Sequence, residues 1–216
     1  MVEVATIAQA VSILAACWAI IAGIGAWKRE FVGKRQIELA ELVLAKFFEI
    51  RDAVAHIRNP FSRNDEGSSR QHGDYESPDE TDLLNRGYIV IERYTKREAV
   101  FAEFNTLKYR FMASFGPETE EIFLDTNKTV HSIFSSARIL ATHYWKRQGR
   151  VPMEGVEFQK HLDEMHKHEG IFWETGDEND EIKRRLNAIQ AKLESAVAPC
   201  FKEPISLYTI LTRRWQ

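Results

Sequence analysis

Histidine and carboxylate side chains recur along one helical face in the segment EFQKHLDEMHKHE. Their spacing of i, i+4, i+7 and i+11 places four side chains on neighbouring turns of a helix. Imidazole and carboxylate groups together suit zinc, iron or manganese, although a metal cage generally takes ligands from a second element as well. The alternative is a charged helix face with Glu-to-His pairs four residues apart. The candidate metal ligands are Glu157, His161, Glu164 and His168, and an opposite helix would supply His131, His143 or a carboxylate.

A second candidate pair is Arg138 and His143, in the sequence Arg-Ile-Leu-Ala-Thr-His. An arginine followed after four residues by a histidine resembles the R-x(4–6)-H element of the HEPN superfamily of helical nucleases. The resemblance covers these six residues, and Ile139 stands where the family usually has a polar residue. It implies catalytic roles for the two side chains, which would cut RNA through the 2′-hydroxyl across a dimer. The alternative is an arginine in a salt bridge and a histidine on the helix surface, about 140° apart around the axis.

A third group mixes basic and aromatic side chains where a predicted helix ends. Such a mixture suits a membrane interface or stacking on bases. Basic residues also gather at helix C-termini because they complement the macrodipole there. The group comprises Tyr144, Trp145, Lys146, Arg147 and Arg150, joined by Arg213, Arg214 and Trp215 near the C-terminus.

The stretch from Val4 to Trp27 contains no charged side chain. As a helix, its roughly 24 residues are long enough to cross a hydrocarbon core of ~30 Å. The apolar run is longer than that of a secretory signal peptide, and the segment before it holds only the charge of Glu3. We therefore predict a transmembrane anchor over residues 1–27. A cleaved signal and a buried soluble helix are the alternatives.

Basic residues follow this stretch at once, at Lys28, Arg29, Lys34 and Arg35. The positive-inside rule then predicts a single-pass protein of the inner (plasma) membrane. Its N-terminus would lie outside, and residues 28–216 would form a cytoplasmic domain. The lipid bilayer is accordingly the first expected partner.

One face of the predicted span is lined by small residues. Faces of this kind let membrane helices approach closely, because lipid tails give no hydrophobic drive and packing must supply the attraction. We expect a homo-oligomer or contact with other membrane-protein subunits, although alanine and glycine are also simply common in such helices. Gln9 and Ser12 are polar residues that would face the lumen if the spans formed a pore. The whole face comprises Ala8, Gln9, Ser12, Ala15, Ala19 and Gly23, with Trp27 at the membrane interface.

The composition is ordinary for one domain plus a span, with 216 residues, 44% of them hydrophobic and 28% charged. A net charge of -3 argues against a surface dedicated to nucleic acid, so we expect no DNA, and RNA only if the nuclease resemblance holds. Cys17 and Cys200 cannot form a disulfide framework, which agrees with a reducing cytoplasm. No motif indicates a cofactor.

Apolar residues recur every three or four positions through most of the remaining chain, and no segment shows sustained alternation with period two. We therefore predict an all-α protein in which the N-terminal helix continues to Ile57 and enters an antiparallel bundle of four to five long helices. Coiled-coil-like crossing is expected for the second helix, over residues 78–115. The further helices are predicted over residues 78–115, 117–147, 153–173 and 180–199.

Residues 58–78 read as a long polar loop, rich in Asn, Ser, Asp and Gly. Loops of this length are usually functional or disordered. The basic residues Arg58, Arg63 and Arg70, with His72, would suit an anion or a partner, although nearby Asp and Glu residues offset their charge.

The leading functional interpretation is a membrane-anchored helical protein that works by interaction, as a homo-oligomer or as an accessory subunit of a membrane complex. The alternative is a membrane effector, either an RNA-cleaving HEPN-like domain or a pore. The sequence favours a protein that is not an enzyme.

Overall fold

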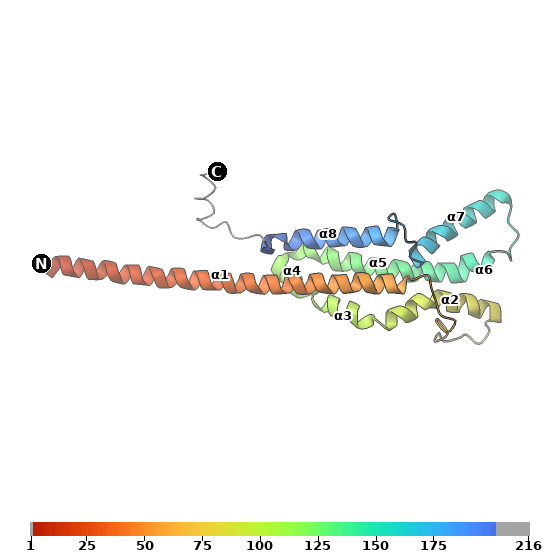
Figure 1. Ribbon diagram of the computed structural model, residues 1–216, viewed down its shortest axis with the longest axis horizontal. Helices are drawn as coiled ribbons and strands as arrows, with labels where there is room; N and C mark the ends of the chain where they lie inside the picture. The colour runs from red at the N-terminus through yellow and green to blue at the C-terminus, as the bar shows by residue number, and fades with distance from the viewer. Residues whose placement is uncertain (1, 202–216) are drawn as a thin grey trace. The chain divides into compact units, whose positions relative to one another are not determined.

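The computed structural model describes residues 2–201, and it places their side chains except in 2–10, 26 and 29. All regular structure in this part of the chain is helical (Figure 1), which confirms the predicted all-α class. The elements are α1 (Val2–Ile57), α2 (Pro78–Thr95), α3 (Glu98–Thr106), α4 (Lys108–Phe115), the 3₁₀ turn η1 (Pro117–Thr119), α5 (Glu120–Ile139), the π-helix η2 (Leu140–Tyr144), α6 (Trp145–Arg147), α7 (Gly155–Phe172) and α8 (Glu181–Phe201).

The chain divides into two compact units. Val43–Ala196 form one of them, and the described residues up to Leu42 and from Val197 onwards form the other. The sequence predicts a domain limit after residue 27, where the apolar stretch ends, whereas the two units are separated by their contacts. That limit stays a prediction.

Helix α1 runs without a break from Val2 to Ile57, as the sequence predicts. Among the described residues it is the one helix long and apolar enough to cross a membrane, with a mean hydropathy of 1.7 in its most apolar window. None of that window is buried inside the chain, and Trp18 is 73% exposed. The alternative of a buried soluble helix therefore loses support. The direction in which α1 would cross a membrane stays a prediction.

The start of the next helix also follows the sequence. The hydroxyl of Ser77 accepts a hydrogen bond from the backbone N–H of Glu80 (3.3 Å), and Pro78 occupies the first turn. A serine cap followed by proline and acidic residues is a favourable helix start, because it satisfies a free N–H and complements the macrodipole.

The prediction of one continuous helix over residues 78–115 is wrong, because this segment is divided into α2, α3 and α4. Side-chain hydrogen bonds to carbonyls of the preceding turn accompany both breaks. Thr95 donates to Ile91 at the first, and Thr106 donates to Glu103 at the second. Such bonds compete with the regular backbone ladder and bend helices. The coiled-coil-like crossing expected of one long helix therefore has no support.

The remaining predicted helices are confirmed, with ends shifted by a few residues. Gly116 ends α4 with φ of +105°, a conformation that favours glycine, where the sequence predicts the break. The helix predicted over residues 117–147 is formed by η1, α5, η2 and α6 in succession.

Aromatic rings fill the centre of the Val43–Ala196 unit. The fully buried ring of Phe104 lies 6.1 Å from Phe47 of α1 and 4.6 Å from Phe123 of α5, measured between centroids. Phe111 of α4 lies 6.0 Å from Phe123. Pairs of this kind are worth about 0.5–1.5 kcal/mol each beyond their buried area. Helix α5 packs against both α2 and α7 (Figure 1), so it joins the two parts of the unit that carry the cavities described below.

A buried arginine fixes the chain just after α1. Arg58 forms an ion pair with Asp180, the residue before α8, and the two side chains are 3% and 1% exposed. The same guanidinium donates to the backbone carbonyls of Gly170, Ile171 and Trp173 at 2.7–2.8 Å. It thus satisfies carbonyls that the end of α7 leaves free and ties the connection between α7 and α8 to the end of α1.

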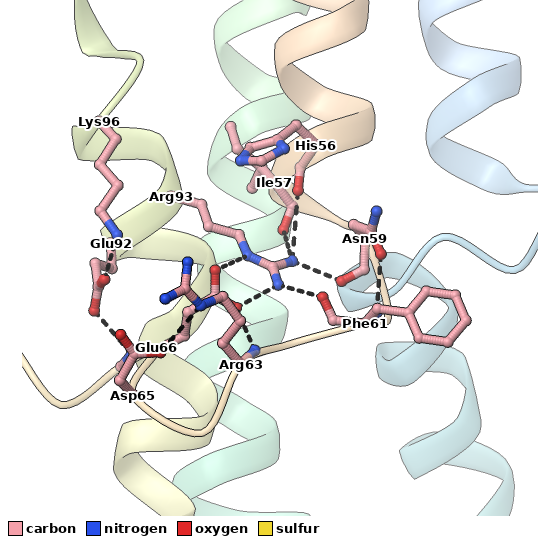
Figure 2. A network of polar contacts seen from close by, with 11 residues as sticks. His56, Ile57, Asn59, Phe61, Arg63, Asp65, Glu66, Glu92, Arg93 and Lys96 are labelled. Atoms are coloured by element: carbon pink, nitrogen blue, oxygen red, sulfur yellow. Dashed lines mark hydrogen bonds and ion pairs between the residues drawn. The ribbon is translucent and has the colours of Figure 1, made fainter.

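A second buried arginine, Arg93 of α2, holds the first half of the polar loop (Figure 2). Its guanidinium donates to the backbone carbonyls of Ile57 (3.3 Å), Asn59 (2.6 Å) and Phe61 (2.8 Å). It also pairs with Glu66 at 2.6 Å. The loop is therefore bound to α2 through its backbone as well as through its side chains.

The second half of the loop is held by two carboxylates. Glu92 of α2 accepts hydrogen bonds from the backbone N–H of Gly67 and from the hydroxyl of Ser69, both at 2.8 Å. Within the loop, Arg70 pairs with Glu76. The charge of Arg70, which the sequence offered as an anion contact, is therefore neutralised inside the loop.

Candidate functional site

The π-helix η2 separates two cavities of the Val43–Ala196 unit. In a π-helix the hydrogen bonds run from i to i+5, so side chains are presented at angles that an α-helix does not give. Arg138, Ala141 and Thr142 line a cavity beside α2, which we call the α2–α5 groove. His143 and Tyr144 line a cavity beside α7, which we call the polar cavity. Because π-turns are frequent at functional sites, both cavities are candidate sites.

The polar cavity has a volume of about 260 Å³ and brings together residues that the sequence placed in separate candidate sites. Helix α7 supplies carboxylate, ammonium and imidazole groups, and η2 with α6 supplies the opposite wall. The lining residues are His143, Tyr144, Arg147, Met153, Glu157, Lys160, His161 and Glu164.

Tyr144 is the aromatic centre of this region. Its ring centroid lies 5.0 Å from that of His143, 5.3 Å from that of His161 and 5.5 Å from that of His168. The Nδ1 of His168 lies 3.1 Å from the hydroxyl of Ser136. Burial lowers the pKa of His168, so the neutral imidazole is favoured. Depending on the tautomer, its Nδ1 either accepts a hydrogen bond from the hydroxyl of Ser136 or donates one to it.

The imidazole of His161 is the least satisfied polar group in the described part of the protein. Its side chain is almost fully buried, at 6% exposure, and its Nε2 has no hydrogen-bond partner. Buried polar atoms in native proteins are nearly always paired, so an unpaired one needs an explanation.

The predicted metal site does not assemble in the described residues. They contain no group of three or more His, Cys, Asp or Glu side chains placed to hold a metal ion. Glu157 pairs with Arg147 (3.4 Å), and His168 contacts Ser136 instead of the cavity. Three of the four predicted ligands, Glu157, His161 and Glu164, line one cavity with His143, and metal binding by them stays a prediction.

Arg138 and His143 line different cavities, although only four residues lie between them in the chain. Within one chain the two side chains therefore do not converge on a common cleft. A shared site would need a second copy of the chain to bring one of them across, and this arrangement stays untested.

Several side chains of the basic and aromatic group make their contacts within the Val43–Ala196 unit. The indole N–H of Trp145 donates to Glu169 at 2.8 Å, and its ring packs edge-on against Phe172. Lys146 pairs with Glu80 and Arg150 pairs with Asp79, both at the start of α2. The bonds explain these positions without a partner or membrane contact, whereas Arg213, Arg214 and Trp215 lie outside the described residues.

The small-residue face of α1 is open in the structure. Ala15, Ala19 and Trp27 are exposed, and a Cβ added to Gly23 would have no atom of the chain within 4 Å. Ser12 is exposed but has an interaction of its own. The side chains of Ala8 and Gln9 lie outside the described residues.

Three residues that shape these regions were missed by reasoning from sequence. The first two are Arg93 and Asp180, whose ion-pair partners, Glu66 and Arg58, are distant in the chain. The third is Gly87, whose lack of a side chain lets α2 approach η2. An isolated glycine at a position that continues an apolar stripe was the only signal for that close approach.

Comparisons with protein families, with curated proteins and with solved structures returned no match.

Proposed function

We propose that this protein is a single-pass membrane protein in which α1 anchors an all-helical domain that works by interaction. The apolar window of α1, of which nothing is buried inside the chain, is the observation that carries this proposal. Leaving so long an apolar surface in water would be costly, whereas a bilayer covers it.

The proposal extends to self-association or docking on other membrane-protein subunits through the small-residue face. Its support is that the described part of this face is not covered by the chain itself, since Ala15 and Ala19 are exposed and a Cβ at Gly23 would have no atom within 4 Å. Close packing of helices in lipid depends on such faces. The proposed location is the inner membrane, with the helical domain in the cytoplasm, as the basic residues after the span favour.

Membrane extraction and thiol labelling test the anchor. The protein should stay in the membrane pellet at high pH and in high salt, and mass analysis should show that the chain retains the apolar stretch from Val4 to Trp27. Recovery in the soluble fraction, or a mass that lacks the N-terminal segment, would refute the anchor.

The two native cysteines report on orientation, because Cys17 lies in the apolar stretch and Cys200 lies outside it. A membrane-impermeant maleimide should label Cys200 only after the inner membrane is opened, and Cys200→Ser should remove this label. Burial raises the pKa of the Cys200 thiol, so labelling needs a mildly alkaline buffer. Labelling in intact cells would reverse the proposed orientation.

The oligomer is tested by Gly23→Leu in the detergent-solubilised full chain. A side chain at this position meets nothing within its own chain, so the change should leave the monomer folded and separate the copies or subunits. Ile20→Leu, on the bulky part of the same helix, is the matched control. If Gly23→Leu leaves the size of the complex unchanged, this face is not the contact.

We put forward neither alternative effector as a second function. The nuclease resemblance needs Arg138 and His143 at one cleft. Within one chain the two side chains line different cavities, and the dimer that could bring them together is untested. The pore interpretation depends on Gln9 and Ser12, and the side chain of Gln9 lies outside the described residues.

A further inference from the structure

The α2–α5 groove has a lining unlike that of the polar cavity. Its volume of about 410 Å³ lies within the range of small-molecule sites, which is roughly 300–1,000 Å³. Its walls are half-buried apolar and aromatic side chains, namely Leu84, Tyr88, Ile91 and Phe134. Ligand pockets are typically apolar with a few polar groups that fix orientation.

The floor of the groove depends on close contact between α2 and η2. A Cβ added at Gly87 would lie 2.8 Å from the Cβ of Ala141 and 3.0 Å from the carbonyl oxygen of Ala137. These distances leave no room for a side chain at Gly87, so the small residues bring the two helices together beneath the larger side chains of the walls. The groove is therefore a product of specific packing.

The charged side chains that line the groove are basic. Among the described residues no carboxylate lines it, and the two guanidinium groups that do belong to Arg70 and Arg138. Arg70 is neutralised by two hydrogen bonds to Glu76. The guanidinium of Arg138 is exposed, and it forms no ion pair within residues 2–201. An unneutralised positive charge thus lies beside apolar walls.

We propose that the α2–α5 groove binds the anion of a single-chain fatty acid. The hydrocarbon chain lies against Leu84, Ile91 and Phe134, and the carboxylate accepts hydrogen bonds from Arg138. The planar fork of a guanidinium matches a carboxylate in two parallel bonds. One alkyl chain suits a groove of this size. The proposal depends on the groove alone and holds whether or not α1 crosses a membrane.

Photolabelling of the full-length protein tests this directly. The protein is placed in nanodiscs of uncharged lipid and exposed to dodecanoic acid that carries a diazirine near the chain end. After tryptic digestion, label should appear in the peptides of residues 87–93 and 129–138, which contain the groove walls Tyr88, Ile91 and Phe134. Unlabelled dodecanoate should compete for these peptides, whereas dodecanol should not. Label in α1 is background, because the probe also dissolves in lipid.

Two variants separate the charge from the groove. Arg138→Met should lower labelling of the groove peptides by roughly tenfold, since a charge-assisted pair is lost while the apolar walls remain. Because Arg138→Met removes a tryptic site, the peptide that begins at residue 129 extends to Lys146 in this variant. Ser135→Trp, at an exposed position of the lining, should block the mouth and abolish labelling. Arg110→Met, at an exposed arginine of α4, is the matched control and should label like the original protein.

Three results would overturn the proposal. Equal labelling of Arg138→Met and of the original protein would show that no carboxylate is bound there. Equal competition by dodecanol would show that only the chain is recognised. Displacement of the probe by a lysophospholipid but not by dodecanoate would assign the groove to a phospholipid instead. Failure of the extraction experiment above would refute the membrane anchor but not the groove. The same labelling and competition would then be carried out on the protein in solution, with the same expected outcomes.

Discussion

Arg58 and Asp180 form a buried ion pair with two parallel hydrogen bonds, 2.8 Å from Nη1 to Oδ1 and 2.7 Å from Nη2 to Oδ2. The carboxylate also accepts the backbone N–H of Lys183 at 2.9 Å in the first turn of α8. The burial of Asp180 tends to raise the pKa of its carboxyl, but hydrogen bonds from Arg58 and from the backbone outweigh this and hold the pKa below its usual range. The pair therefore stays ionised and joins the end of α1 to the start of α8.

Removing one partner of this pair should destabilise the protein strongly. Arg58→Met or Asp180→Ala alone should lower the free energy of unfolding by about 3–5 kcal/mol, because each leaves a buried charge without its partner. The double variant Arg58→Met/Asp180→Ala should lose less than the sum of the two single changes. Chemical denaturation of the full chain in detergent measures these values.

The control for this cycle is Arg63→Met, because Arg63 is 83% exposed and pairs only with exposed Asp65. Its effect should stay within about 0.5 kcal/mol. Additive losses in the double variant would contradict the coupling of Arg58 with Asp180.

Arg93 should control the order of the polar loop (Figure 2). Arg93→Met removes the donors to the carbonyls of Asn59 and Phe61 and leaves Glu66 without its partner. We expect a loss of about 2–4 kcal/mol, since one buried carbonyl, two part-buried carbonyls and one charge are left unpaired. Hydrogen exchange should rise in residues 59–70 more than in α5.

Arg97→Met is the comparison for the loop, because Arg97 is an exposed arginine just after the same helix. It should leave hydrogen exchange in residues 59–70 unchanged. If Arg93→Met also leaves this exchange unchanged, the loop is held by Glu92 and Arg70 without help from Arg93.

Acid should weaken the contacts that Glu76 and Glu92 make. The pKa of Glu76 falls from an ordinary 4.5 to about 2, chiefly through hydrogen bonding to Arg70, and that of Glu92 falls to about 2, chiefly through Lys96. Because each folded-state pKa lies below the unfolded one, the stabilisation is complete above about pH 4.5 and is lost as the pH falls towards 2. The melting temperature should decline through this window.

Glu76→Gln and Glu92→Gln should each flatten that decline, because the titrating group is gone. Asp52→Asn, at an exposed position of α1, should leave it unchanged. A melting temperature in the original protein that stays constant from pH 5 to 2 would contradict the prediction.

His161→Leu should raise the free energy of unfolding by about 1 kcal/mol at neutral pH, because it removes a buried Nε2 that has no partner. His143→Leu, at an exposed position of the same cavity, should change little. A clear loss of stability in His161→Leu would mean that a bound group satisfies Nε2, and the polar cavity would then become the primary ligand site.

The parts of the fold that could be predicted are those that residues close together in the sequence determine. The cap at Ser77, the stop at Gly116 and the apolar stretch of α1 each follow from neighbouring residues, and the structure contains all three. The breaks around residues 96 and 107 were missed because apolar periodicity continues across them. There, weak side-chain bonds to the backbone decide whether the helix bends.

The sequence by itself determined an all-helical chain that begins with a long apolar helix, because helix periodicity, caps and hydropathy are properties of adjacent residues. Only the tertiary structure decided which distant side chains meet. It placed Asp180 on Arg58, brought His143 to the face of α7 that carries His161, and turned Arg138 to the α2–α5 groove. The positions of His143 and Arg138 depend on the packing of α5 against α2 and α7 and on the π-turn of η2, and neither has a reliable signal in a single sequence.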